Sequence, residues 1–539
     1  MHNSGAGLLV ETLETNGCAH IFGNPGTTEL PFIGEIAASD ISYITCLHED
    51  IAVGAAAGYA IRVRQRGVKN PFSVANVHTT PGVGHALGNL YGASFARCPV
   101  ILTAGCQEPR HERRRPPLSG NRLSLVTNFV KYAEKVERPE EMGESLVGAI
   151  RRSLTPPMGP SYLEFTVGAQ TDETASTPPM VGSLPSVPCP RQREIKRVSS
   201  LLEHGSTTII VGTELAQTGS EAIQATVELA ERLDASVIAE PLSAELGFPT
   251  THEQWRGMLP LSPAKAREWL STDVLLFIGC THPEPLLDYE GQLWPQHAKA
   301  IWIGHHEQSV PASHSYATTV IGEMTETVHQ LAQVVEPRLA LDGGRWMSDR
   351  SKPAHTEKLA KQQLVEALST SASDAIIIDE GVTTGFLLRN EGVVDPRRYV
   401  SNNSGGLGYG LPAAVGAAIA EDHLSTNPRP VVGLIGDGSY QYYPQTLYTA
   451  AQHVSGSLTV VVPDNRGYEI LREHETVVED ERGDRPLTFD ESISIVKNAE
   501  SYGIDAWDVT DLSQLRSVLD AAINNPGTDV VVVDLSNGG

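Results

Sequence analysis

The sequence of 539 residues contains no cysteine pair with C-x-x-C spacing, and its six cysteines are scattered along the chain. Scattered single cysteines fit reduced thiols better than a disulfide or zinc framework. No apolar run approaches the roughly 18 residues that a membrane-spanning helix needs. The N-terminus also lacks the basic start and long apolar stretch of a signal peptide. We therefore expect a globular cytoplasmic protein without a membrane partner.

Positive charge is scarce as well. The chain has 40 Lys and Arg against 65 Asp and Glu, which gives a formal net charge of −25 at pH 7. Nucleic-acid binding requires a basic footprint for the phosphates, so we expect no nucleic-acid partner. The one dense basic run is HERRR, residues 111–115. Its default interpretation is a solvated loop on an acidic protein, and attraction of an acidic substrate group is the alternative.

Two stretches have the composition of linkers, residues 171–192 and about 336–355. The three segments between and beside them alternate short β-branched apolar runs with longer helical patterns. This alternation is typical of buried parallel strands joined by crossover helices. The sequence therefore predicts an α/β protein with three doubly wound parallel-sheet domains in series, at residues 1–175, 192–335 and 356–539.

Polar residues follow two consecutive apolar runs in the last segment. The run 431–436 ends at Asp437, a helical pattern follows, and the run 457–463 ends just before Asn465. A βαβ unit brings both residues to the carboxyl ends of parallel strands, where open α/β sheets bind ligands. A carboxylate, an amide oxygen and the backbone carbonyl of Gly467 suit Mg²⁺. Gly-Asp-Gly alone is a common turn, so the prediction depends on the paired Asn.

This pairing of Gly-Asp-Gly with a later Asn resembles the thiamine-diphosphate enzyme superfamily. The chain departs from the superfamily pattern at Asp464, where another Asn is usual, but the ligating position is intact. The resemblance implies thiamine diphosphate and Mg²⁺ as cofactors, with a pyrimidine-binding first domain and a diphosphate-binding last domain. It also implies cofactor contacts from Asn24, Pro25, Gly436, Asp437, Gly438, Ser439, Asn465, Gly467 and Tyr468.

Glu49 stands where an apolar run meets a helical pattern rich in Ala and Gly. A Glu at a helix start by default only compensates the helix dipole. The superfamily, however, has a Glu at this place that exchanges a proton with the aminopyrimidine ring and so activates the cofactor. The resemblance assigns that role to Glu49 and places the small residues 54–58 at a dimer interface. It therefore implies a homodimer or homotetramer with active sites shared between chains.

Two further segments resemble cofactor-binding parts of the superfamily. In SNNSGGLGYG the resemblance makes Leu407 the bulky residue that bends the cofactor, with Gly405 and Gly406 beside it. A buried leucine in an ordinary glycine-rich loop is the alternative. In IIIDEGVTTGF it places the hydroxyl groups of Thr383 and Thr384 near the diphosphate.

Longer segments, among them IFGNPGTTELPF and NVHTTPGVGHALGNL, resemble the benzoylformate decarboxylase family. In that family a hydroxyl residue in the first segment and a histidine in the second face the substrate, which points to Thr27 and His78. The implied reaction converts a 2-oxo acid into an aldehyde and CO₂ without oxidation. A second histidine of the same segment, His85, receives no role.

The sequence departs from the benzoylformate decarboxylase family at two parts of the expected active site. The family's second active-site histidine is expected where Leu286 stands, with His282 several residues earlier, and His474 is a further candidate. Ile470 and Leu471 occupy positions where smaller and aromatic groups are usual, which leaves an aryl or a more polar acid as the substrate. Two other functions stay open, a carboligase such as an aldehyde lyase or acetolactate synthase, and a catalytically idle thiamine-diphosphate-binding protein.

Overall fold

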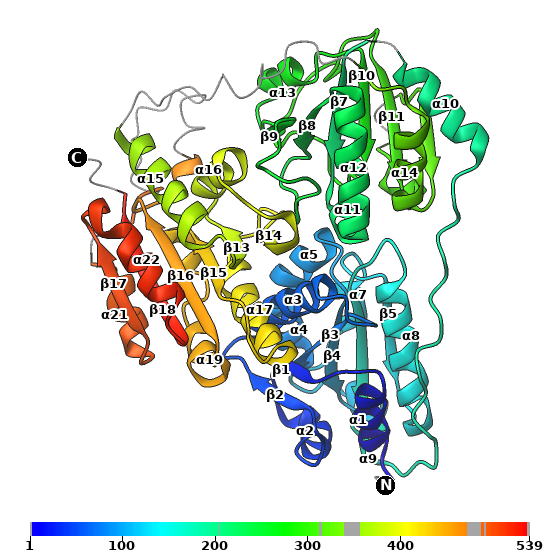
Figure 1. The fold of residues 1–539 in the computed structure, drawn as a ribbon. Coiled ribbons are helices and arrows are strands. Elements are labelled where there is room, and N and C mark those ends of the chain that lie inside the picture. The colour runs from blue at the N-terminus through cyan, green and yellow to red at the C-terminus, as the bar shows by residue number, and fades with distance from the viewer. Residues whose placement is uncertain are drawn as a thin grey trace. The chain divides into compact units, whose positions relative to one another are not determined.

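The computed structural model describes residues 3–203, 205–311, 315–338, 356–471, 487–489 and 492–535 (Figure 1). The chain forms two compact units. The first comprises Met1–Pro185, Ser404–Thr510 and Asp520–Asp534, and the second comprises Ser186–Asn403, Asp511–Leu519 and Leu535–Gly539. The domain bounds given by the linker-like stretches remain a prediction.

The N-terminal part of the first unit is built on a six-stranded sheet with the order β2-β1-β3-β4-β6-β5. All of its pairs are parallel, and β4 is buried along its whole length. The strands are β1 (His20–Asn24), β2 (Ser42–Thr45), β3 (Ser73–His78), β4 (Val100–Cys106), β5 (Tyr132–Val136) and β6 (Ser161–Thr166). The helices are α1 (Gly5–Thr15), α2 (Leu30–Ile36), α3 (Glu49–Gln65), α4 (Thr79–His85), α5 (Leu87–Phe95), α6 (Pro109–Glu112), α7 (Arg122–Val126), α8 (Met142–Leu154) and α9 (Val167–Thr171).

The middle of the chain forms a second parallel sheet with the order β12-β11-β10-β7-β8-β9. Its core holds Phe277, Trp302 and neighbouring apolar side chains. The strands are β7 (Thr207–Val211), β8 (Ser236–Ala239), β9 (Trp255–Met258), β10 (Val274–Ile278), β11 (Lys299–Gly304) and β12 (Thr318–Ile321). The helices are α10 (Gln192–Leu202), α11 (Thr213–Thr218), α12 (Ser220–Leu233), α13 (Pro263–Trp269) and α14 (Met324–Val334).

The third sheet has the order β14-β13-β15-β16-β18-β17. The strands are β13 (Ile376–Glu380), β14 (Tyr399–Ser401), β15 (Val431–Ile435), β16 (Ser457–Asp464), β17 (Asp505–Val509) and β18 (Gly527–Asp534). The helices are α15 (Thr356–Ser371), α16 (Thr383–Glu391), α17 (Gly410–Leu424), α18 (Asp437–Tyr440), α19 (Thr446–His453), α21 (Ile495–Ser501) and α22 (Leu515–Ile523).

The predicted fold class, three doubly wound parallel sheets with helices between the strands, is confirmed. In each sheet the first strand of the chain lies in the interior, and later strands are added on both sides of it. This winding brings the carboxyl ends of neighbouring parallel strands to the same edge of the sheet. The first and third sheets share one strand order when each is numbered from its own first strand. No helix of the described ranges combines the length and the apolar character needed to cross a membrane.

Within the first unit, α3 packs directly against α17, the equivalent helix of the third sheet, as Figure 1 shows in blue and yellow. Glycines bring the two backbones into contact. A Cβ on Gly58 would lie 2.0 Å from the carbonyl oxygen of Ala413, and a Cβ on Gly416 would lie 1.9 Å from that of Ala55. Within the chain these small residues pack against α17, and their predicted place at a dimer interface remains a prediction.

Replacing Gly58 with Ala is expected to lower the thermal midpoint of unfolding, because the new methyl group meets backbone that cannot move aside. Overpacking of this kind costs about 1–3 kcal/mol. Gly34 in α2 is the matched control, because a Cβ there meets no atom within 4 Å and alanine is the better helix former. Differential scanning calorimetry of both variants measures the effect. An unchanged midpoint for Gly58→Ala would contradict the close contact.

Candidate functional site

Glu49 is the first residue of α3 and is held between two parts of α4. The helix start is set by His48, whose Nδ1 accepts the backbone N–H of Asp50 at 3.1 Å. The Glu49 side chain lies 3.1 Å from His85 Nδ1 through its Oε2 atom. A Cβ on Gly82 would come within 3.2 Å of Glu49 Oε1. With only 9% of its surface exposed, Glu49 has a fixed position at the edge of the first sheet.

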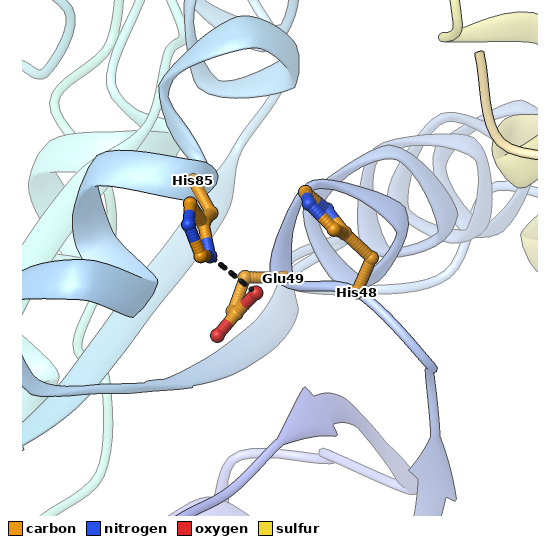
Figure 2. Close-up of side chains that lie close together, drawn as sticks. All are labelled: His48, Glu49 and His85. Carbon is orange, nitrogen blue, oxygen red and sulfur yellow. Dashed lines mark hydrogen bonds and ion pairs between the residues drawn. The ribbon is translucent and has the colours of Figure 1, made fainter.

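Two histidines flank this carboxylate, as Figure 2 shows. The rings of His48 and His85 are stacked, with centroids 5.3 Å apart and an interplanar angle of 27°. His85 received no role from the sequence, yet it is the side chain that bonds Glu49. The last residue of α4 reaches back to the first residue of α3, and only the fold reveals that proximity.

The predicted cofactor-bending loop is tied to the same helix start. Asn89 donates its backbone N–H to Asp50 Oδ1 at 2.7 Å and its Nδ2 to the carbonyl of Gly408 at 3.4 Å. Tyr443 donates its hydroxyl to Asp50 Oδ2 at 2.9 Å. Burial raises the pKa of Asp50 to about 6. Leu407, next to Gly408, is half-buried and therefore belongs to a loop anchored beside Glu49.

Gly405 and Gly406 are exposed in the same loop. Gly405 has a φ of 75°, a conformation that a residue with a Cβ rarely adopts. The three loop positions thus lie on one continuous turn before α17, and their contacts with a cofactor remain a prediction.

His78, at the end of β3, is oriented by a buried glutamate. Its Nδ1 lies 2.7 Å from Glu29 Oε2. Glu29 is 1% exposed and also accepts the backbone N–H groups of Gly26 at 2.9 Å and Gly105 at 2.7 Å. A carboxylate on Nδ1 fixes the tautomer of the ring and leaves Nε2 as the nitrogen that exchanges a proton with a ligand.

Sequence reasoning missed Glu29 and its neighbour Thr28. The Thr28 hydroxyl donates to Glu29 Oε1 at 2.8 Å and lies 3.3 Å from His78 Nδ1. The predicted substrate-facing hydroxyl, Thr27, is exposed and opens the turn that follows Asn24 and the exposed Pro25. A signal for Glu29 does exist, because a Glu three residues after the start of a helical turn can accept the backbone N–H of the first residue, as Glu29 does from Gly26.

The predicted metal ligands Asp437 and Gly467 are in direct contact. Asp437 is buried at the carboxyl end of β15 and accepts the backbone N–H of Gly438 at 2.8 Å through Oδ1. Its Oδ2 accepts the backbone N–H of Gly467 at 2.9 Å. The amide of Asn465 is oriented by Glu469, which accepts from Nδ2 at 2.9 Å. The amide oxygen of Asn465 is buried.

The electrostatics of this site fit a cation. Burial raises the pKa of Asp437 to about 7, and the negative charge of Asp464 adds to the rise. A divalent ion would offset both effects, because an opposite charge at a few ångströms favours the ionised carboxylate. Carboxylate, amide and carbonyl oxygens form a hard donor set of the kind that Mg²⁺ prefers. Asp464, the departure from the superfamily pattern, therefore raises the pKa of the neighbouring predicted ligand Asp437.

A cavity of about 260 Å³ opens beside Asp437. Four carboxylates line it at the ends of parallel strands, and they belong to Asp437, Asp464, Asp508 and Asp534. Ser439 is buried in the short helix after Gly436, and Tyr468 packs edge-on against Phe489 at 5.0 Å. Arg466 also lines the cavity, and a divalent cation would offset the excess of negative charge that a diphosphate meets there.

The remaining predicted site residues belong to other parts of the chain. Thr383 and Thr384 open α16, in the second unit. His282, in the same unit, donates its backbone N–H to the buried Glu240, and Leu286 is exposed. His474 lies outside the described residues, and Arg113–Arg115 are exposed. The roles predicted for these residues remain predictions.

Three family models match the chain. They are described as the thiamine pyrophosphate enzyme N-terminal TPP binding domain at residues 3–123, the central domain at residues 195–331, and the C-terminal TPP binding domain at residues 379–533. The first covers Glu49 and His78, and the last covers Asp437 and Asn465. Both halves of the candidate site thus fall in segments whose models are named for cofactor binding.

Individual relatives agree with these matches. Benzoylformate decarboxylase of Pseudomonas aeruginosa is 27% identical over 95% of this chain and 95% of its own length. Acetolactate synthase of Arthrospira platensis is 25% identical over 98% and 94%. The solved structure of a thiamine-diphosphate-dependent 4-hydroxybenzoylformate decarboxylase of Rhodococcus jostii RHA1 has a TM-score of 0.85 at 26% identity, over 98% and 99%. The chain belongs to the thiamine-diphosphate-dependent enzymes.

Proposed function

We propose that this protein is a Mg²⁺-dependent non-oxidative decarboxylase that splits a 2-oxo acid into an aldehyde and CO₂. The observation that carries the proposal is the oriented His78. Its Nδ1 is held at 2.7 Å by buried Glu29, and α4 joins it to the residues that hold Glu49. Release of an aldehyde requires a proton donor, and a histidine with one fixed nitrogen meets that need. The names of the Pseudomonas and Rhodococcus relatives agree with this chemistry.

Bound thiamine diphosphate supplies a nucleophilic carbon and an electron sink for the electrons left by CO₂. The carboxyl group of Glu49 would exchange a proton with the aminopyrimidine ring. Asp437, Asn465 and the carbonyl of Gly467 would hold Mg²⁺, whose charge would offset that of the diphosphate. The loop with Leu407 would support the cofactor between its aminopyrimidine and diphosphate ends. His78 donates and accepts a proton at Nε2, and the hydroxyl of Thr27 orients the substrate.

The test is turnover of a panel of 2-oxo acids by the purified protein with thiamine diphosphate and Mg²⁺. Benzoylformate, 4-hydroxybenzoylformate, pyruvate and a 2-oxo diacid cover aryl, alkyl and acidic substrates. We expect CO₂ and free aldehyde in equal amounts from at least one acid. A carbon–carbon coupled product without free aldehyde would assign the carboligase function instead. Cofactor binding without release of CO₂ from any acid would contradict the proposal.

Replacing His78 with Ala is expected to lower kcat/KM for the best acid by about 10²–10⁴-fold, the range for loss of a general acid or base. Glu29→Gln keeps the shape of the partner but removes its charge, so a smaller loss is expected. His111, an exposed histidine of the same unit, is the matched control. Steady-state kinetics of the three variants measure the effect. Wild-type kcat/KM in His78→Ala would exclude the proton-transfer role.

We also propose that the protein acts in the cytoplasm as a homodimer or homotetramer with shared active sites. None of the six cysteines forms a disulfide and five of them are buried, which supports a reducing compartment. Native mass spectrometry of the purified protein tests the assembly, and a monomer with full activity would contradict it.

A further inference from the structure

We propose that His48, Glu49 and His85 form a binding site for a transition-metal ion of the zinc class, and that this ion competes with the thiamine cofactor for Glu49. The competition rests on the proposed function, because it requires Glu49 to face the cofactor. Metal binding by the three side chains does not depend on that function.

The three side chains already offer suitable atoms at suitable separations. One ligand atom from each lies within 4.8 Å of the other two. Zinc ligands at 2.0–2.1 Å in a tetrahedron are roughly 3.4 Å apart. The His85–Glu49 contact of 3.1 Å satisfies this spacing, and Figure 2 shows both rings beside the carboxylate. With 57% of its side chain exposed, His85 has room for the small rotation that closes the site.

The donor set selects the kind of metal. Two imidazoles and one carboxylate with an open fourth position are the ligands of many catalytic zinc ions. Imidazole suits Zn²⁺, Cu²⁺ and Ni²⁺, whereas Mg²⁺ prefers oxygen ligands. Within the described part of the chain, no other three His, Cys, Asp or Glu side chains meet so closely. The protein thus has an oxygen site for Mg²⁺ at Asp437 and a separate nitrogen-rich site at Glu49.

Metal binding changes two local hydrogen bonds. His85 exchanges its hydrogen bond to Glu49 for a metal bond. His48 Nδ1 accepts the backbone N–H of Asp50, so binding through Nε2 shifts the ring proton to Nδ1 and gives up that cap. The ring of Tyr443, whose centroid lies 5.1 Å from that of His48, packs against the imidazole and holds it beside Glu49 when this hydrogen bond is lost.

The consequence is a metal-sensitive activation step. An ion bound to Glu49 occupies the oxygen that would otherwise carry the proton for the aminopyrimidine ring. A cofactor already in place covers the same oxygen and excludes the ion. Zinc added before the cofactor is therefore expected to block activation of the protein by thiamine diphosphate. Zinc added to the protein that already holds the cofactor is expected to have little effect on activity.

The experiment is isothermal titration of the cofactor-free protein with ZnCl₂. Excess MgCl₂ keeps the Asp437 site occupied, and a Cys189→Ser background removes the one exposed thiol. We expect one zinc ion per chain. His85→Ala removes an exposed ligand, and His48→Asn removes a ligand while keeping a side chain that caps helices well. Each is expected to weaken zinc binding by more than about tenfold, because loss of a partner that only supports a metal ligand already costs about that much. His329→Ala, an exposed histidine of α14, serves as the unchanged control.

A second titration in the presence of excess thiamine diphosphate separates the two claims. Loss of zinc binding there, together with weakened binding in both histidine variants, supports the whole proposal. Absence of zinc binding, or equal affinity in His85→Ala, overturns the metal site. Zinc binding that depends on His85 but ignores the cofactor upholds the metal site and contradicts the placement of Glu49 at the cofactor.

Discussion

Replacing Glu49 with Gln is expected to slow the exchange of the C2 proton of bound thiamine diphosphate by about 10²–10⁴-fold. The amide has the size of the carboxylate and still bonds His85, but it cannot pass a proton to the aminopyrimidine ring. Cofactor binding should remain measurable, because the diphosphate is held elsewhere. Deuterium exchange at C2, followed by NMR after acid quench, measures the effect directly.

The control for this experiment is Glu144→Gln. Glu144 is an exposed glutamate in the first turn of α8, so its replacement removes the same charge from the same place on a helix. A loss caused only by destabilising a helix start should appear in both variants. Wild-type exchange in Glu49→Gln would end the activation role.

Replacing Asp437 with Ala is expected to weaken cofactor retention by roughly a hundredfold or more. Loss of a charge-assisted contact costs about 3 kcal/mol, and each 1.4 kcal/mol is tenfold in affinity. The variant also leaves the backbone N–H groups of Gly438 and Gly467 without their acceptor. Bound cofactor is measured by fluorescence after gel filtration at millimolar Mg²⁺.

Asp508→Ala is the matched control, because Asp508 lines the same acidic cavity and is exposed. A general electrostatic effect of the cavity would lower retention in both variants. Full retention in Asp437→Ala would remove this residue from the metal site.

The sequence predicted those parts of the site that local connectivity determines. Asp437 and Gly467 are brought together by one βαβ unit, whose geometry follows from the order of its elements. Glu49 was recognisable because a strand, a glutamate and an Ala-rich helix are consecutive in the chain. The three parallel sheets followed in the same way from alternating apolar runs and helical patterns.

Contacts between distant segments were not predictable in that way. Glu29 meets His78 because β1 and β3 are adjacent in the sheet, and strand adjacency depends on the global winding. His85 reaches Glu49 only because α4 folds back toward α3. Single residues of these kinds carry no local pattern that separates them from ordinary surface or core residues.

The backbone contact between α3 and α17 has a mechanical consequence. Helices separated by a layer of side chains can slide as rotamers change, but carbonyl groups pressed against a facing glycine leave nothing to repack. Glu49 opens one of these helices, and the loop with Leu407 leads into the other. Glu49 and the loop with Leu407 are therefore attached to one rigid pair of helices within the chain. This pair of helices is therefore expected to move as one body, so that Glu49 and the loop with Leu407 keep their separation within the chain.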